Sequence, residues 1–217
     1  MGDDLKIKGK AILFSEMTPP SGKEEEFNDW YDGHHSPSHV QGVPGFISAM
    51  RYKSDDGPHY LAVYELTGQE ALEHEEYKKR KLTPDDPTYQ MLQSVSGFTR
   101  YIAEEKSFET ASTASLCGLN SQIVYCQFLS LAPDKTPDFV AYFKDEMISS
   151  LRAEATWKAT RHLKIVQYDP EPYSDLILHY LDEINLEGRF WETRSAGKFQ
   201  PHNVFYRMRG SRFLKTE

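Results

Sequence analysis

The chain has 217 residues, enough for one domain or two small ones, and 39% of them are hydrophobic, which is enough to build a core. A net charge of -8 and a pI near 5.5 argue against a nucleic-acid or anionic-membrane partner, because contacts to phosphates need clustered Lys and Arg. No stretch approaches the roughly 20 apolar residues of a membrane span and no signal peptide is recognisable, so we expect a soluble, cytoplasmic protein.

The first half of the chain predicts the order strand, helix, strand, strand, helix, strand. The first helix has an acidic start, which suits that end of the helix dipole. Pro37 ends or bends this helix, so the position of His39 relative to it stays open. The predicted segments are strands 10–16, 45–53, 59–66 and 97–105 and helices 23–36 and 68–80, with one or two further helical turns over 88–95.

After residue 108 the sequence loses its periodicity, and 109–120 is small and polar, as linkers are. The same order of elements then begins again. The predicted segments are strands 121–131, 158–168, 174–183 and 202–209, and helices 137–152 and 186–196. We therefore expect two units, 1–108 and 121–217, joined by the linker 109–120.

The two units can be compared by a shift of 112 residues. This shift puts Phe143 at the position of Tyr31 and Met147 at the position of His35. The second unit thus keeps the apolar packing positions and loses the histidines. A polar site is expected in the first unit, with Phe143 and Met147 as an apolar wall opposite to it.

The stretch FNDWYDGHHSP, residues 27–37, gathers aromatic and imidazole groups on one short helix. At 3.6 residues per turn, Trp30 lies on the apolar face, while Tyr31, His35 and His39 follow one edge at intervals of four residues. An imidazole suits proton transfer because its unperturbed pKa lies near neutrality. This edge is therefore the candidate for chemistry.

Together with the PGF at 44–46, the Arg51-Tyr52 pair and the YLAVYEL at 60–66, this stretch resembles the EthD-like branch of the dimeric α+β barrel superfamily. The resemblance covers the first half of the chain. It implies an α+β fold of two tandem ferredoxin-like βαββαβ units, whose antiparallel sheets face each other as a pseudo-dimeric α+β barrel. It also implies that the barrel between the sheets holds a small, often aromatic, ligand.

Neighbouring residues on a helix point about 100° apart, so His34 and His35 cannot both face one cavity. The resemblance assigns His35 to the cavity, either as an acid/base or as a structural, hydrogen-bonded imidazole. His34 stands where the family has an acidic residue, which departs from a Glu-plus-His mechanism. Arg51 either neutralises a carboxylate or an enolate of the ligand, or forms an ion pair at the surface or barrel mouth.

The candidate residues fall into two groups. Those expected to be catalytic are His35, Tyr31 and Arg51. Those expected to bind substrate are Trp30, His34, His39, Tyr60, Tyr64, Phe143 and Met147, where Tyr60 and Tyr64 are either phenolic donors into the barrel or ordinary core residues.

No cofactor is expected, because the sequence has no GxGxxG, GxxxxGK[ST], GxSxG or HExxH motif. No metal is expected either, since His35 and His39 have no obvious third ligand near them in sequence. The two cysteines, Cys117 and Cys126, are too few for a disulfide framework and are expected to be reduced thiols.

The leading hypothesis is a cofactor-independent enzyme of secondary metabolism, a lyase, cyclase or isomerase. In it, His35 moves a proton on an aromatic or polyketide-like compound during decarboxylation, cyclisation or isomerisation. One alternative is a non-catalytic ligand carrier or accessory protein to an oxygenase, and another is a haem or metal oxidative protein. Whether the chain forms a homodimer stays open.

Overall fold

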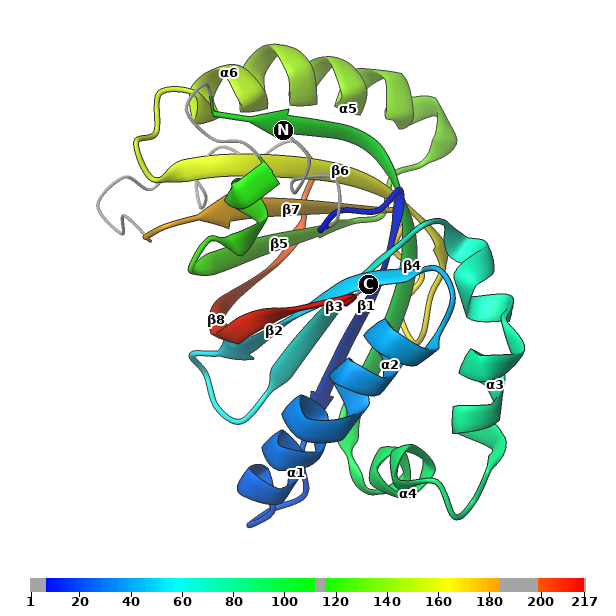
Figure 1. Cartoon of the computed structure of the whole chain (residues 1–217). Coiled ribbons are helices and arrows are strands. Elements are labelled where there is room, and N and C mark those ends of the chain that lie inside the picture. The colour runs from blue at the N-terminus through cyan, green and yellow to red at the C-terminus, as the bar shows by residue number, and fades with distance from the viewer. Residues whose placement is uncertain (1–6, 112–115, 184–198, 217) are drawn as a thin grey trace.

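Eight antiparallel strands pair side by side in the order β1-β3-β2-β8-β5-β7-β6-β4, and β4 returns to β1, so that the sheet closes into a barrel (Figure 1). The computed structural model describes residues 7–111, 116–183 and 199–216. The strands are β1 Ala11–Thr18, β2 Phe46–Ser54, β3 Tyr60–Leu66, β4 Ser96–Thr110, β5 Ile123–Leu129, β6 Trp157–Gln167, β7 Asp175–Leu181 and β8 His202–Leu214.

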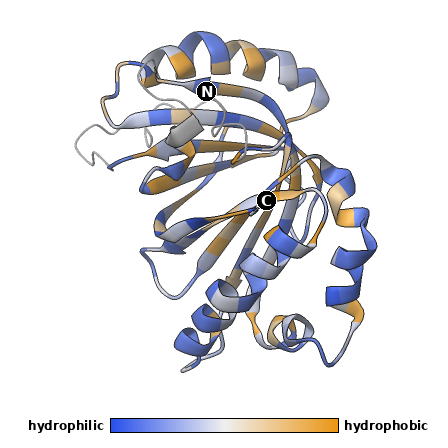
Figure 2. Cartoon of the chain, viewed as in Figure 1, coloured by the Kyte–Doolittle hydropathy of each residue, from blue (hydrophilic) through white to orange (hydrophobic). Residues whose placement is uncertain are grey.

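The described α-helices lie on the outside of this barrel (Figure 1). The α-helices are α1 Glu24–Trp30, α2 Ser36–Gly42, α3 Glu75–Leu82, α4 Pro87–Ser94, α5 Thr136–Tyr142 and α6 Ile148–Leu151. Hydrophobic and hydrophilic residues alternate along α5 and α6, as expected of helices that cover a sheet, whereas α3 is mostly hydrophilic (Figure 2). None of the described helices is long and apolar enough to cross a membrane.

Two of the helical segments contain a five-residue π turn. One, Tyr31–His35, joins α1 to α2, and the other, Phe143–Met147, joins α5 to α6 at a position 112 residues further along. In the first, the N–H of Ser36 bonds to the carbonyl of Tyr31. The helix therefore runs through Pro37 to Gly42, and Pro37 neither ends it nor separates His39 from it.

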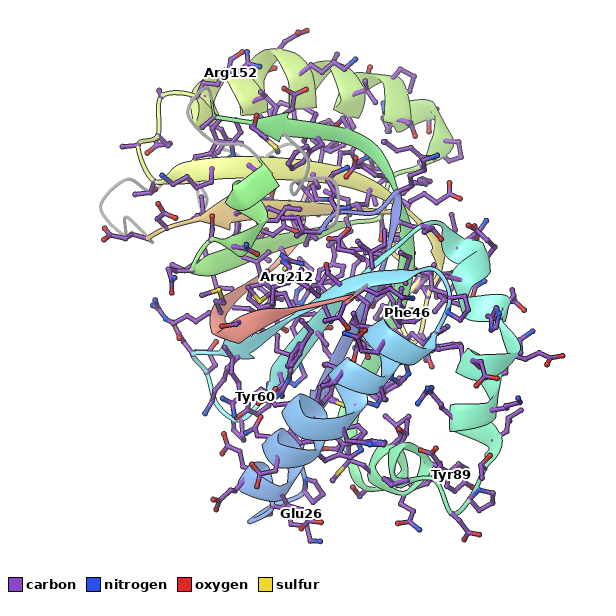
Figure 3. All side chains as sticks on the ribbon, in the orientation of Figure 1. Glu26, Phe46, Tyr60, Tyr89, Arg152 and Arg212 are labelled. Carbon is purple, nitrogen blue, oxygen red and sulfur yellow. The ribbon has the colours of Figure 1, made fainter. Side chains whose placement is uncertain are left out.

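The alternation of side chains along the strands divides the interior into separate cores. Ile12 and Phe14 of β1 point into the barrel, whereas Leu13 points toward α1 and α2. All seven residues of β3 are buried, because one face fills the barrel and the other packs under the helices. Tyr60 and Tyr64 belong to the core on the helix-covered face, so of the two alternatives the structure supports core residues and not donors into the barrel. Figure 3 shows Tyr60 on the side that α1 covers.

The barrel interior is packed with side chains of both halves of the chain. Its buried members are Ile7, Ile12, Phe14, Met50, Tyr52, Leu61, Val63, Tyr101, Ala103, Leu119, Val124, Cys126, Phe128, Ala159, Leu163, Ile165, Leu176, Leu178, Tyr180 and Tyr206. The expectation that the barrel itself holds the ligand is therefore not met. The candidate cavity described below lies on the outer, helix-covered face of the sheet.

Several predicted boundaries differ from the structure. β4 runs to Thr110 instead of residue 105, because its polar end pairs with β6, and periodicity alone does not reveal such pairing. The helix expected over 68–80 breaks at His74, whose side chain accepts from the backbone N–H of Glu76 at the start of α3. The helix expected over 186–196 lies outside the described residues.

Cys126 is a buried free thiol, as expected, and burial raises its pKa well above the usual value. The side chain of Cys117 lies outside the part of the chain that the structure describes.

A buried charge cluster ties the two halves of the barrel together. Arg161 of β6 donates from Nη1 to Oε1 of Glu65 at 2.5 Å and from Nε to Oε2 of Glu105 at 2.8 Å. Burial alone would lower the pKa of Arg161, but these carboxylates outweigh it and raise that pKa. The second oxygen of Glu65 accepts from the N–H of Gly9 at 2.9 Å, so the cluster is well satisfied.

We expect Arg161→Met to lower the free energy of unfolding by about 3–5 kcal/mol, because it leaves Glu65 buried without its cation. Urea unfolding monitored by circular dichroism measures this loss. Adding Glu65→Gln to the variant should restore part of it. A double variant no more stable than Arg161→Met would show that the cost arises from packing and not from the unpaired charge.

Candidate functional site

A small cavity lies between the sheet and the helical segment that runs from α1 through the π turn into α2. Its volume is about 30 Å³, room for about one water molecule. It is lined by Leu13, Ser15, Met17, Tyr31, His35, His39, Tyr64, Tyr77, Leu92, Phe98 and Arg100. The cavity thus combines an apolar wall with imidazoles, phenols and one guanidinium, which is the composition of a small-molecule site.

His35 is the buried imidazole at the end of the π turn. Its ring centroid lies 4.4 Å from that of Trp30 and 4.8 Å from that of Tyr31. Its Nδ1 lies 3.4 Å from the hydroxyl of Thr88, a buried residue of α4. Tyr31 and His35 begin and end the π turn, and both line the cavity.

His39 lies one turn further along and also lines the cavity. Its ring centroid is 4.3 Å from that of His35. Its Nδ1 lies 2.8 Å from the carbonyl oxygen of His35, and because a carbonyl only accepts, this nitrogen carries the proton. In the neutral ring, Nε2 is then the basic nitrogen.

Three phenols complete the polar wall: Tyr31, Tyr64 and Tyr77. Burial raises the pKa of Tyr31 to about 12, although the neighbouring Tyr64 hydroxyl and the positive charge of Arg51 act in the opposite direction. Burial likewise raises the pKa of Tyr64 well above its usual value. At neutral pH both phenols are protonated, so they serve as hydrogen-bond donors and not as bases.

Arg100 is the charged cavity residue that sequence reasoning did not identify, and the phenol of Tyr77 was missed as well. Arg100 lies on β4 opposite Ser15 of β1. The alternation of side chains along a strand could have identified it, since Phe98, Arg100 and Ile102 share the face of β4 that meets the helices. Arginine is uncommon on a covered face, so this alternation could have made Arg100 a candidate.

The remaining candidates on this side of the barrel lie outside the cavity. His34 does not line it, and Trp30 packs against the ring of His35 from behind. The hydroxyl of Tyr60 accepts from Nδ2 of Asn28 at 3.1 Å and donates to the carboxylate of Glu24. Tyr60 therefore fastens α1 to the sheet.

Arg51 is fully buried beneath α1, and the structure does not bring it to the cavity. It donates to Oδ1 of Asp32 at 2.6 Å and to Oδ1 of Asn28 at 2.9 Å. Its guanidinium carbon lies 4.2 Å from the ring centroid of Tyr31, a cation–π contact. Arg51 thus forms an ion pair, as one alternative expected, but it does so buried beneath α1 and not at the surface or barrel mouth.

Phe143 and Met147 do not face the candidate cavity. They belong to the core between α5, α6 and the second half of the barrel, where they pack with residues such as Phe139 and Trp157. The expectation that they form the opposite wall is wrong, because the two helical layers cover opposite outer faces of the barrel (Figure 1).

The helix-covered face of the second half holds a buried polar network of its own. The indole N–H of Trp157 donates to the Thr160 hydroxyl at 2.8 Å, and this hydroxyl lies 2.8 Å from Nδ1 of His179. Nε2 of His179 lies 2.9 Å from Oε1 of Gln127. Burial lowers the pKa of His179 to about 3, so this histidine is neutral and structural at physiological pH.

No group of three or more His, Cys, Asp or Glu side chains suited to hold a metal ion occurs among the residues that the structure describes. The cavity offers two imidazoles and no carboxylate.

No protein-family model matches the sequence, and no curated protein is similar to it in sequence. Solved structures do resemble the fold. An anthrone oxidase-like protein superposes with a TM-score of 0.68 at 11% identity, over 98% of this chain and 96% of the other.

Two further structures match with similar coverage. A protein from Lactobacillus acidophilus with a provisional monooxygenase assignment gives a TM-score of 0.58 at 10% identity, over 95% of this chain and 96% of the other. A second such protein, from Fusobacterium nucleatum, gives 0.61 at 9% identity over 95% of both chains. These neighbours have the dimeric α+β barrel, or ferredoxin-like, fold, and at such identities they establish the fold alone.

We expect Arg51→Met to lower the free energy of unfolding by about 2 kcal/mol, because it removes two hydrogen bonds from a buried charged donor. Arg51→Lys should lose nearly as much, since an ammonium cannot bond both Asp32 and Asn28 in the same planar fork. Chemical denaturation measures both losses. A stability equal to that of the parent chain would contradict the role of Arg51 as the fastener of α1.

The buried His179 predicts a pH dependence of stability. Its pKa is lower in the folded chain, so between pH 6.5 and about 3 the unfolded state binds the extra proton. Stability should therefore fall as the pH falls through this window, by up to about 1.4 kcal/mol per pH unit. His179→Gln removes this titration, so unfolding curves across that window should show a shallower loss than in the parent. An unchanged slope would contradict the prediction.

Proposed function

We propose that the chain is a cofactor-independent enzyme that moves a proton on an enolisable aromatic or polyketide-like compound. The observation that supports it best is the pair of imidazoles, His35 and His39, in ring contact on the wall of a cavity that also presents phenolic donors. Imidazoles are the side chains best suited to exchange protons near neutrality.

In the proposed reaction, His35 takes a proton from a carbon next to a carbonyl group. The electron pair of that C–H bond moves onto the carbonyl oxygen, which becomes an enolate. The protonated Tyr31 and Tyr64, which line the same cavity, would donate hydrogen bonds to this oxygen. Return of the proton at another carbon gives isomerisation, and attack of the enolate carbon on a second carbonyl gives cyclisation.

An aromatic ligand needs more space than the 30 Å³ of this cavity. The element best suited to move is α4, in which Thr88 is the only buried residue. α4 contributes Leu92 to the cavity wall and the Thr88 hydroxyl beside His35. Outward movement of α4 would admit a ring, and its return would exclude water and restore the contact with His35.

Two other hypotheses remain as alternatives with less support. A carrier or accessory protein would use the same cavity without needing imidazoles in contact. For a haem, the cavity is much too small, and the His35 and His39 rings are packed among other aromatic side chains, so the residues present do not fit that group.

We further propose that the barrel consists of two tandem ferredoxin-like units of the EthD-like branch, 1–108 and 121–217. The π turns, Tyr31–His35 and Phe143–Met147, support this, because they recur at the 112-residue shift that the sequence suggests. The partner that we propose is a small molecule, with neither nucleic acid nor membrane involved.

His35→Ala should slow proton exchange by about a hundred- to ten-thousand-fold, the usual contribution of a general acid or base. The reaction can be followed with anthrone in D2O containing a cosolvent and kept free of oxygen. Proton NMR then records the loss of its methylene signal, with the uncatalysed rate subtracted. Thermal melting shows whether the variant stays folded.

His34→Ala is the matched control, since the neighbouring imidazole does not line the cavity, and it should keep the parent rate. Equal exchange rates in His35→Ala and the parent would contradict the catalytic role of His35. Binding of anthrone by the parent without any accelerated exchange would favour the carrier hypothesis instead.

A further inference from the structure

Arg100 places a positive charge in the cavity that no neighbouring carboxylate neutralises. No Asp or Glu lines the cavity, and among the described residues Arg100 forms no ion pair. Its Nε is buried and has no hydrogen-bond partner there. The positive charge of Arg100 contributes to lowering the pKa of Glu73, but the main cause is Lys78, whose Nζ lies 2.6 Å from Oε2 of Glu73.

Such a site discriminates between ligands by charge. A guanidinium is ionised at every physiological pH, so a ligand that displaces water from Arg100 removes the hydration of a full charge. A neutral ligand offsets little of the free-energy cost of this desolvation, whereas an anionic ligand offsets it through attraction between opposite charges.

We infer that Arg100 is the anchor for a carboxylate on the substrate, so that the substrate is an enolisable aromatic acid. This inference rests on the proposed function, since it takes the cavity beside His35 as the substrate site. A carboxylate matches the planar fork of the guanidinium, which can donate two parallel hydrogen bonds to it. The anchor would hold the ring in one orientation, with its reactive carbon toward His35.

The geometry of the cavity is compatible with Arg100 binding the carboxylate while His35 transfers the proton. Arg100 comes from β4, while His35 and His39 come from the helix that covers the sheet. A ligand bound through its acid group at the sheet would thus present another part of its ring system to the imidazoles. Ser15, which pairs with Arg100 across β1 and β4, also lines the cavity, and its hydroxyl donates to the carbonyl of Thr99 at 3.1 Å.

The test uses two probes of almost the same shape, benzoate and benzamide, of which only the first is charged at neutral pH. Isothermal titration calorimetry should show that the full chain binds benzoate at least tenfold more tightly than benzamide. Arg100→Gln should weaken benzoate binding by about ten- to a hundredfold and leave benzamide binding nearly unchanged, so that the preference disappears.

Arg80→Gln is the matched control, because Arg80 of α3 also has a buried Nε without a partner among the described residues but does not line the cavity. It should keep the preference for benzoate. Arg100→Lys keeps the charge without the fork and should keep only part of the preference, which provides a second reading if Arg100→Gln is poorly folded.

The inference is overturned if the parent chain binds both probes equally or neither, or if Arg100→Gln still prefers benzoate. Its failure is distinct from failure of the proposed function, because anthrone is uncharged and its proton exchange depends on His35. If proton exchange on anthrone requires His35 but the chain binds benzoate and benzamide equally, the proposed enzymatic function stands and the carboxylate anchor at Arg100 is rejected.

Discussion

Closure of the sheet is the constraint on which the rest of the structure depends. Once β4 pairs with β1 and β6, and β2 pairs with β8, each strand has one face inside the barrel and one face outside it. The inner face fills with side chains from both halves, as small barrels require. The candidate site accordingly lies where a helical layer meets the outer face, and His35 and Arg100 both line it.

Local patterns in the sequence predicted much of the first half because its elements are defined locally. The edge formed by Tyr31, His35 and His39 follows from helical spacing and is present in the cavity. The side to which β3 turns Tyr60 and Tyr64 could not be predicted in this way. Alternation groups residues on one face, but it does not say which face the helices cover.

Residues from distant segments explain the rest of the site. Thr88 and Arg100 reach the cavity from α4 and β4, and neither lies near the histidines in sequence. Arg51 illustrates the opposite error. Its proximity to the motif suggested chemistry, yet its two terminal nitrogens donate to Asp32 and Asn28. Only the tertiary structure distinguishes an arginine that fastens a helix from one that faces a cavity.

The second half of the chain shows that the π turn can occur without the polar side chains of the candidate site. It has a π turn at Phe143–Met147, where Phe143 and Met147 pack into an apolar core. The π turn is therefore compatible with simple packing, and its presence alone does not indicate catalysis, although such turns often mark functional sites. What distinguishes the first half is the set of side chains that its turn presents to the sheet. In the first half, the turn presents imidazoles opposite a guanidinium on the strand, and a polar cavity lies between them. In the second half, Phe143 and Met147 occupy the corresponding positions of the turn and pack into the core.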